Sequence, residues 1–166
     1  MDKTSLFFEQ TALESALPRL CHALLKASAT PLTLALDGDL GAGKTTLTRH
    51  FAQALGLQAR VTSPSFVLMN VYRHPQEADA QAGLIHADFY RLDDASAESV
   101  VAELEEHGAQ RPMWVWVEWA SRIPRFAQTV DLQLDITVAE EARRYRFTGV
   151  SEQGLQAVMA LREALT

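Results

Sequence analysis

One glycine-rich stretch of the chain carries residue types that bind phosphate. Positions 38–45 read GDLGAGKT and match the pattern G-x-x-x-x-G-K-[ST] in full. In such a loop the backbone N–H groups converge on phosphate oxygens, and the N-terminal end of the following helix faces the same anion. Lys44 is then placed to reach the β- and γ-phosphates, and the Thr45 hydroxyl is placed to contact Mg²⁺. The pattern predicts a nucleotide-binding loop.

A glycine turn that binds nothing is the alternative interpretation of this stretch. By average residue usage the pattern arises by chance in about one chain in a hundred of this length. The context favours nucleotide binding, because an apolar strand is predicted before the loop and a helical run after it.

Two carboxylates at the ends of predicted strands are candidates for phosphoryl-transfer chemistry, which needs an acid near the metal and a group that orients the nucleophile. Asp88 and Glu118 each close an apolar run, where a carboxylate is costly to bury unless something pairs with it. The alternatives are a salt bridge with Arg91 or a helix cap for Asp88, and an ion pair with Arg122 for Glu118. The sequence leaves open which acid holds Mg²⁺ and which positions water.

A third feature is the hydroxyl-rich segment TSPSF at 62–66. Hydroxyls around a rigid proline suit a loop that senses a γ-phosphate or its metal. Serine and proline also favour ordinary turns, so a turn that enters a strand is the alternative.

Hydrophobic periodicity predicts the elements that must position these residues. The expected strands are 5–9, 32–36, 66–72, 84–90, 113–119, 130–138 and 143–150, and the expected helices are 11–29, 44–55, 95–106 and 152–165. Pro18 is expected to kink the first helix or to mark its late start. The strands 66–72 and 84–90 are expected to form a hairpin through the polar stretch 74–83. The order predicts an α/β fold with a parallel core and antiparallel additions.

Length and composition set the broad class of protein. The 166 residues predict one domain over 1–166, and 48% hydrophobic with 22% charged residues is typical of a globular chain and excludes disorder for most of it. No apolar run approaches the roughly 18 residues of a membrane helix, and the N-terminus does not resemble a signal peptide. Cys21 is the single cysteine, which favours a reducing compartment. We therefore expect a cytoplasmic protein with no membrane contact.

The net charge of −6 argues against a domain that grips nucleic acid by itself. Six acids between Arg91 and Arg111 account for all of it, and no lysine or arginine lies among them: Asp93, Asp94, Glu98, Glu103, Glu105 and Glu106. A solvated helix face and a docking surface for a basic partner are the two interpretations.

Four segments, taken in this order, carry a resemblance to a known family: GDLGAGKTT at 38–46, SPSF at 63–66, HADFYRL at 86–92 and EW at 118–119. Together they resemble the TsaE (YjeE) family of small P-loop ATPases, which act in making N6-threonylcarbamoyladenosine in tRNA. The resemblance spans about residues 11–119. Ser65 stands where the family usually has threonine, and Ala120 where proline commonly follows EW.

The resemblance implies a P-loop NTPase-like three-layer fold, with a central parallel sheet flanked by antiparallel strands. It implies ATP/ADP and Mg²⁺ as ligands, and ATP hydrolysis that is slow alone and stimulated by partners. The implied partners are TsaD-like and TsaB-like subunits, which form the threonylcarbamoyl transferase core, so that tRNA is reached only indirectly.

The resemblance also implies roles for individual residues. Lys44, Asp88 and Glu118 are the implied catalytic residues, and Thr45, Asp88 and Glu118 the implied Mg²⁺ contacts. The implied nucleotide-binding residues are Thr11, Asp39, Leu40, Gly41, Ala42, Gly43, Lys44, Thr45, Thr46 and Trp119.

Three other functions use the same loop. A small-molecule kinase usually has an Arg-rich lid, and the stretch 74–83 carries no arginine. A GTPase switch is disfavoured, because no N-K-x-D motif is present and no D-x-x-G follows the loop. A nucleotide-bound scaffold with negligible turnover stays open.

Several weaker features have both plain and functional interpretations. Aromatic residues in an apolar strand are usually core, so we expect Trp114 and Trp116 inside the protein. Cys21 is expected in the core, and His86 is expected to be a structural histidine rather than a metal ligand. The basic cluster could meet phosphate, tRNA or a partner, or could form a solvated strand face; it consists of Arg143, Arg144 and Arg146.

Overall fold

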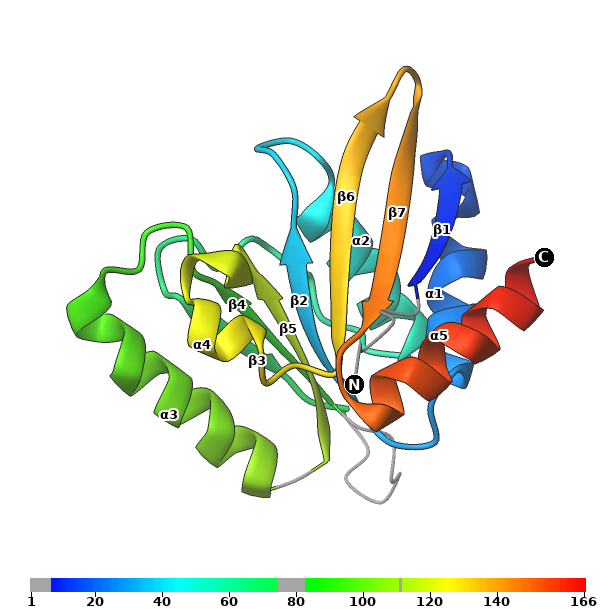
Figure 1. The fold of residues 1–166 in the computed structure, drawn as a ribbon. Coiled ribbons are helices and arrows are strands. Elements are labelled where there is room, and N and C mark those ends of the chain that lie inside the picture. The colour runs from blue at the N-terminus through cyan, green and yellow to red at the C-terminus, as the bar shows by residue number, and fades with distance from the viewer. Residues whose placement is uncertain (1–6, 75–82, 111) are drawn as a thin grey trace, which may run out of the picture.

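A computed structural model describes residues 7–74, 83–110 and 112–166, and they form a seven-stranded sheet between two helical layers (Figure 1). The strands are β1 (Phe7–Ala12), β2 (Thr33–Asp37), β3 (Met69–Tyr72), β4 (Gly83–Asp88), β5 (Met113–Glu118), β6 (Leu132–Ala139) and β7 (Ala142–Gly149). The helices are α1 (Leu17–Lys26), α2 (Lys44–Ala54), α3 (Asp94–Gln110), α4 (Pro124–Ala127) and α5 (Glu152–Leu165), with short 3₁₀ turns η1 (Glu14–Ala16) and η2 (Ala120–Arg122).

The strand order is β1-β7-β6-β2-β5-β4-β3. The four central strands β6, β2, β5 and β4 run parallel, while β7 and β1 at one edge and β3 at the other pair antiparallel. This arrangement confirms the predicted fold class, and the antiparallel pair β3–β4 confirms the predicted hairpin.

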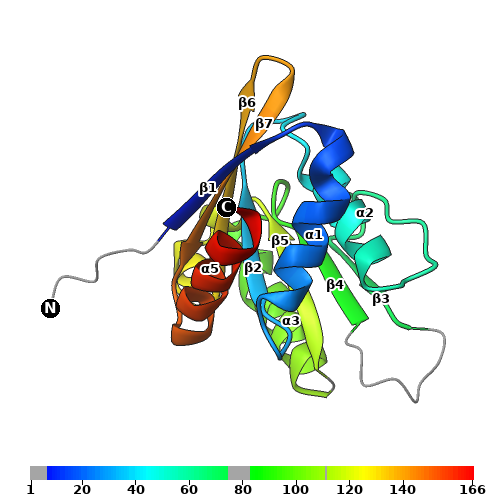
Figure 2. The ribbon, with the colours of Figure 1, turned by 90° about the vertical axis from the view of Figure 1, so that its right-hand side faces the viewer.

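Two apolar clusters hold the layers together. One packs α1, α2 and α5 against one face of the sheet, and the other packs α3 and α4 against the opposite face, as Figures 1 and 2 show. Alternation along β5 serves both clusters, because Trp114 and Trp116 face the first and Val115 and Val117 the second. The Phe51 ring of α2 lies edge-on to the Trp114 ring, with 4.8 Å between ring centroids, and stacks on the Trp116 ring, with 4.3 Å between ring centroids. The prediction that both tryptophans are core is confirmed, as is that for Cys21, which is fully buried.

The N-terminal region differs from the expected elements. The first strand continues to Ala12, so Thr11 lies in β1 and not in a helix. The helix begins at Leu17, and Pro18 occupies its first turn, where a missing backbone N–H costs no hydrogen bond. The expected late start is therefore confirmed, while the prediction that the helix begins at Thr11 is wrong.

Other features of the chain also differ from the sequence predictions. The strand expected over 66–72 begins at Met69, because the backbone N–H groups of Val67 and Leu68 both donate to the Pro64 carbonyl and form a turn. The helix α4 was not expected, since four residues carry too little periodicity to detect. Val138 is 58% exposed, so the predicted inward alternation of its strand ends before it. Most of the stretch 74–83, predicted to be a loop, lies outside the described residues.

Within the part of the chain that the structure describes, no helix has the length and apolar character to cross a membrane.

Candidate nucleotide-binding site

The predicted phosphate loop connects β2 to α2 and is shaped by its glycines. Gly38 has a φ of +146°, and a Cβ atom there would lie 2.4 Å from the carbonyl oxygen of Ile136 in β6. Gly43 has a φ of +107° and is the N-cap residue of α2. Only glycine adopts such conformations without strain, so these two positions determine the path of the loop.

Lys44 begins α2 and its ammonium turns back across the loop. Nζ donates to the carbonyls of Gly38 at 2.6 Å and Asp39 at 3.0 Å, and lies 4.2 Å from the centroid of the Trp119 ring. The side chain is buried. Burial lowers the pKa of Lys44 below its ordinary value, and nearby carboxylates, Glu118 foremost, act in the opposite direction. The site therefore holds a largely desolvated cation where a phosphate would bind.

Strand register brings the acids to this loop. In the parallel pair β4–β5, Asp88 stands opposite Glu118, and β5 lies directly beside β2. Because the carboxyl ends of parallel strands meet at one edge of a sheet, both acids lie near the loop that follows β2. His86 precedes Asp88 by two residues and so faces the same side of the sheet.

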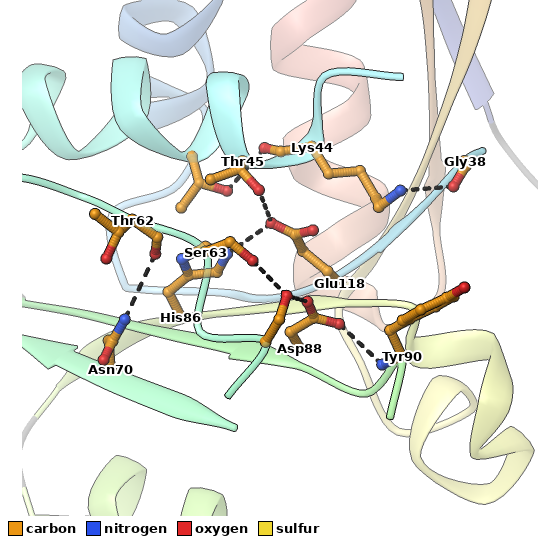
Figure 3. Close-up of polar contacts among 12 residues, drawn as sticks. Gly38, Lys44, Thr45, Thr62, Ser63, Asn70, His86, Asp88, Tyr90 and Glu118 are labelled. Carbon is orange, nitrogen blue, oxygen red and sulfur yellow. Dashed lines mark hydrogen bonds and ion pairs between the residues drawn. The ribbon is translucent and has the colours of Figure 1, made fainter. Parts of the chain in front are cut away.

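Glu118 is buried, and one of its oxygens takes two contacts (Figure 3). Thr45 Oγ1 donates to Oε1 at 2.7 Å, and Nε2 of His86 lies 2.8 Å from the same atom. The alternative ion pair with Arg122 is not found among the described residues; that guanidinium lies 5.8 Å from the Tyr90 ring centroid.

Asp88 is also buried and has a separate set of donors. Its Oδ2 accepts from Ser65 Oγ at 2.8 Å, and its Oδ1 accepts from the Tyr90 backbone N–H at 2.8 Å. Ser63 and Ser65 share a hydroxyl contact at 2.6 Å, so the hydroxyl-rich segment is joined to this acid.

Neither structural alternative for Asp88 is found in the described part of the chain. The Arg91 guanidinium lies 4.6 Å from the centroid of the Phe66 ring. At the start of α3, the backbone N–H of Ser96 donates to Asp93 Oδ1, so Asp93 and not Asp88 caps this helix. A hydrogen bond to Ser96 lowers the pKa of this exposed Asp93 carboxyl.

These groups line an open cavity of about 250 Å³ beside the loop. Nine residues that the sequence predicts for the site contribute to its wall: Leu40, Gly41, Gly43, Lys44, Thr45, Thr46, Asp88, Glu118 and Trp119. Ser63, Ser65 and Tyr90 complete it. Trp119 reaches the cavity because its φ of +58° turns the chain sharply after β5.

Three predicted residues do not line this cavity. Asp39 contributes its carbonyl to Lys44, and buried Ala42 faces a second hollow of about 160 Å³, which shares Gly41, Gly43 and Thr46 with the first. Thr11 pairs with Arg144 across β1 and β7 and lines neither hollow. Its predicted place at the adenine end of a nucleotide stays a prediction.

The sequence predicted no site role for His86 or Tyr90, and for Arg143 it left contact with phosphate, tRNA or a partner open beside a solvated strand face. His86 touches Glu118, and the H-x-D spacing that places both residues on one strand face was the available signal. Arg143 donates from Nε to the Ala42 carbonyl at 3.1 Å and lines the second hollow. That contact spans 101 residues and had no local signal. Its neighbour Arg144 pairs with Glu9 at 3.4 Å.

The donor set fits Mg²⁺ in combination with phosphate. The Thr45 hydroxyl and the two carboxylates are oxygen donors, which Mg²⁺ prefers. In the described ranges, no group of three or more His, Cys, Asp or Glu residues is arranged to hold a metal ion. A phosphate-bound Mg²⁺ takes most of its ligands from phosphate oxygens and water rather than from protein side chains.

Comparison with known proteins agrees with this geometry. The sequence model for "Threonylcarbamoyl adenosine biosynthesis protein TsaE" matches residues 11–146. The chain belongs to the TsaE family. The match extends past the segment that the motifs covered and includes β6 and part of β7. The family acts in the biosynthesis of threonylcarbamoyladenosine in tRNA.

Individual TsaE relatives support this membership. The chain is 36% identical to the protein named "tRNA threonylcarbamoyladenosine biosynthesis protein TsaE" from Bacillus subtilis, over 72% of this chain and 71% of that one. A protein of the same name from Streptomyces coelicolor is 36% identical, over 71% of this chain and 80% of that one. The chain also matches a Synechocystis relative of that name at 36% identity, over 54% of this chain and only 55% of the relative.

A solved structure extends the TsaE comparison over the whole fold. The crystal structure of Bacillus subtilis YdiB superposes with a TM-score of 0.73 at 27% identity, and covers 98% of both chains. The α/β fold that the sequence predicts is therefore found in an experimental structure of similar sequence.

Proposed function

We propose that this TsaE-family chain binds ATP with Mg²⁺ in the phosphate-loop cavity and hydrolyses it slowly. The observation that carries the proposal is the 2.7 Å hydrogen bond between Thr45 Oγ1 and Glu118 Oε1, in a cavity that Lys44 and Asp88 also line. A loop hydroxyl beside a strand-end carboxylate is the pairing with which P-loop enzymes hold their metal.

Each residue has a part in this proposal. The loop N–H groups and the Lys44 ammonium would bind the β- and γ-phosphates, and the Thr45 hydroxyl with Glu118 would hold Mg²⁺. Bound Mg²⁺ would offset negative charge on the transferred phosphoryl oxygens. Asp88, which already accepts from Ser65 and the Tyr90 N–H, would orient water at the cavity. The segment that carries Ser65 would then respond to the γ-phosphate through the same hydrogen bond.

The relatives' names support a place in tRNA threonylcarbamoyladenosine synthesis and leave the partners open. We propose TsaB-like and TsaD-like subunits as those partners. These subunits would form the transferase core and carry out the transfer to adenosine, and ATP hydrolysis by this chain would reset or license that core. The net charge of −6 favours contact with tRNA through those subunits over direct binding.

Phosphate release from ATP, measured with the full chain alone and with a TsaB–TsaD pair, tests the function. We expect slow release without any acceptor, a requirement for Mg²⁺, and stimulation by the pair. Stoichiometric phosphorylation of a metabolite would indicate a kinase instead. Tight ATP binding with no turnover in either condition would indicate a scaffold.

A further inference from the structure

His86 is a fully buried histidine beside the proposed metal site. It lies in β4 with no exposed surface, and its Nε2 is 2.8 Å from Oε1 of Glu118. The strand register pairs His86 with Trp116, so Glu118 is its diagonal neighbour on the same face of the sheet. The contact therefore follows from the H-x-D and W-x-E spacings on adjacent parallel strands.

The hydrogen bond assigns the proton on the imidazole. A carboxylate oxygen accepts hydrogen bonds from a ring N–H, so the 2.8 Å contact assigns the shared hydrogen to Nε2 of His86. The other ring nitrogen, Nδ1, is buried and has no hydrogen-bond partner among the described residues. A buried polar atom without a partner is unfavourable, so an apolar residue would suit this position better if packing were its only task.

The carboxylate is held from two elements at once. Thr45 at the start of α2 and His86 in the middle of β4 both donate to the same oxygen, Oε1. The described part of the chain provides no hydrogen bond to Oε2, and Glu118 lines the cavity. Two donors from separate elements prevent the carboxylate from rotating, and Oε2 is left as the oxygen available to a ligand.

We propose that His86 is a positioning residue, whose Nε2–H holds Glu118 in the orientation that receives Mg²⁺. This inference rests on the proposed function, since it assigns His86 a task at that same site. Outer residues that orient metal-binding side chains typically change metal affinity or activity by about 10- to 100-fold when they are replaced. His86 itself touches neither the cation nor the nucleotide.

Two substitutions of similar polarity separate this role from packing. The amide nitrogen of His86→Gln lies about where Nε2 lies, whereas that of His86→Asn lies about where Nδ1 lies. We expect His86→Asn to raise the Mg²⁺ concentration for half-maximal hydrolysis by about 10- to 100-fold, and His86→Gln to stay near the wild type. ATP binding in EDTA, and thermal unfolding, control for a general defect in both variants. Equal behaviour of the two variants, whether both near the wild type or both impaired, would overturn the proposal.

A spectroscopic measurement keeps the proposal testable if either variant folds poorly. Long-range ¹H–¹⁵N correlation spectra of the wild-type chain without nucleotide distinguish the two tautomers of each histidine. We expect His86 as the Nε2–H tautomer, identified by its absence from the spectrum of His86→Gln or by through-bond assignment. An Nδ1–H tautomer would overturn the proposal. A wild type that binds no ATP would overturn the proposed function and leave the tautomer result unaffected.

Discussion

At the scale of single residues, the two carboxylates of the site have separate hydrogen-bond donors. Glu118 takes its contacts from Thr45 and His86, and Asp88 takes its own from Ser65 and the Tyr90 backbone. This separation supports different tasks for the two acids, because the first is joined to the loop hydroxyl and the second to the hydroxyl-rich segment. Opposite both stands Lys44, the buried cation of the site.

Removal of that cation tests the phosphate loop. We expect Lys44→Ala to weaken ATP binding by about 10- to 100-fold, the typical worth of a hydrogen bond to a charged group. Titration calorimetry measures the affinity, with Lys26→Ala, an exposed lysine at the end of α1, as the matched control. Unchanged affinity in Lys44→Ala would refute the loop assignment.

Glu118→Gln tests the carboxylate with almost no change in shape. We expect ATP to bind still, while hydrolysis falls about 100-fold or more, because the negative charge that would hold Mg²⁺ beside Thr45 is lost. Phosphate release and ATP affinity are measured together, and Glu163→Gln on the exposed face of α5 serves as the control. Near-normal turnover in Glu118→Gln would remove this residue from the reaction.

At the scale of elements, the site depends on close packing between the loop and β6. Gly38 approaches the Ile136 carbonyl, and Arg143 at the start of β7 donates to the Ala42 carbonyl. The hairpin of β6 and β7, which extends beyond the rest of the sheet in Figure 1, therefore forms one wall of the loop. The other wall comes from β5 and β4, which present the acids.

A methyl group at Gly38 tests this packing. We expect Gly38→Ala to destabilise the fold by about 1–3 kcal/mol. The positive φ of this residue disfavours a side chain, and the added Cβ would lie 2.4 Å from the Ile136 carbonyl oxygen. Urea unfolding gives the change in stability. Gly108→Ala in α3 is the matched control, since a Cβ there meets nothing within 4 Å, and it is expected to gain about 0.5–1 kcal/mol. A neutral Gly38→Ala would contradict this description of the loop.

The burial of Cys21 on the inner side of α1 predicts a pH effect on stability. Burial raises the pKa of this thiol to about 12, so it stays neutral in the folded chain and is expected not to react with disulfide reagents at pH 8. Above the ordinary thiol pKa, Cys21 ionises in the unfolded chain but not in the folded one. The contribution of Cys21 to the free energy of unfolding therefore falls by up to about 1.4 kcal/mol per pH unit until the folded thiol also ionises. Urea unfolding of wild type and Cys21→Ala at pH 7 and 10 isolates this difference. Fast labelling of the native thiol would contradict its burial.

At the scale of the whole molecule, the site joins parts of the chain that lie far apart in sequence. The cavity draws on the β2–α2 loop, the segment at 63–65, the end of β4 and the end of β5. A ligand that contacts all of them binds only the folded state, so binding and global stability are linked.

Mg²⁺ and ATP together are therefore expected to stabilise the chain by about 2.7 kcal/mol when ATP is present at 100 times its dissociation constant. Thermal unfolding with and without the nucleotide measures the shift, and Lys44→Ala, with its roughly 10- to 100-fold weaker binding, should be stabilised by only about 0.4–1.4 kcal/mol at the same ATP concentration. An equal shift in wild type and variant would place ATP elsewhere on the molecule.

Local patterns accounted for most of the fold. Apolar alternation and helical spacing predicted the central strands and α5, whose bounds Glu152–Leu165 match the predicted range. These patterns gave wrong predictions where a contact with a distant residue or a turn overrides the local preference. Near the N-terminus an amphipathic pattern continued through Thr11, although pairing with β7 extends the strand over it. At 66–68 β-forming residues are held in a turn by the Pro64 carbonyl.

The chemical groups of the site could be predicted from the amino-acid sequence. The glycine spacing, Lys44, Thr45 and the two strand-end acids could be identified because each depends on residue type and on neighbours a few positions away. Which of these groups meet depends on the tertiary fold. His86 with Glu118 and Arg143 with Ala42 are separated by 32 and 101 residues, and these contacts depend on strand order and register. Strand order and register are determined by the packing of the whole sheet, which no local pattern encodes.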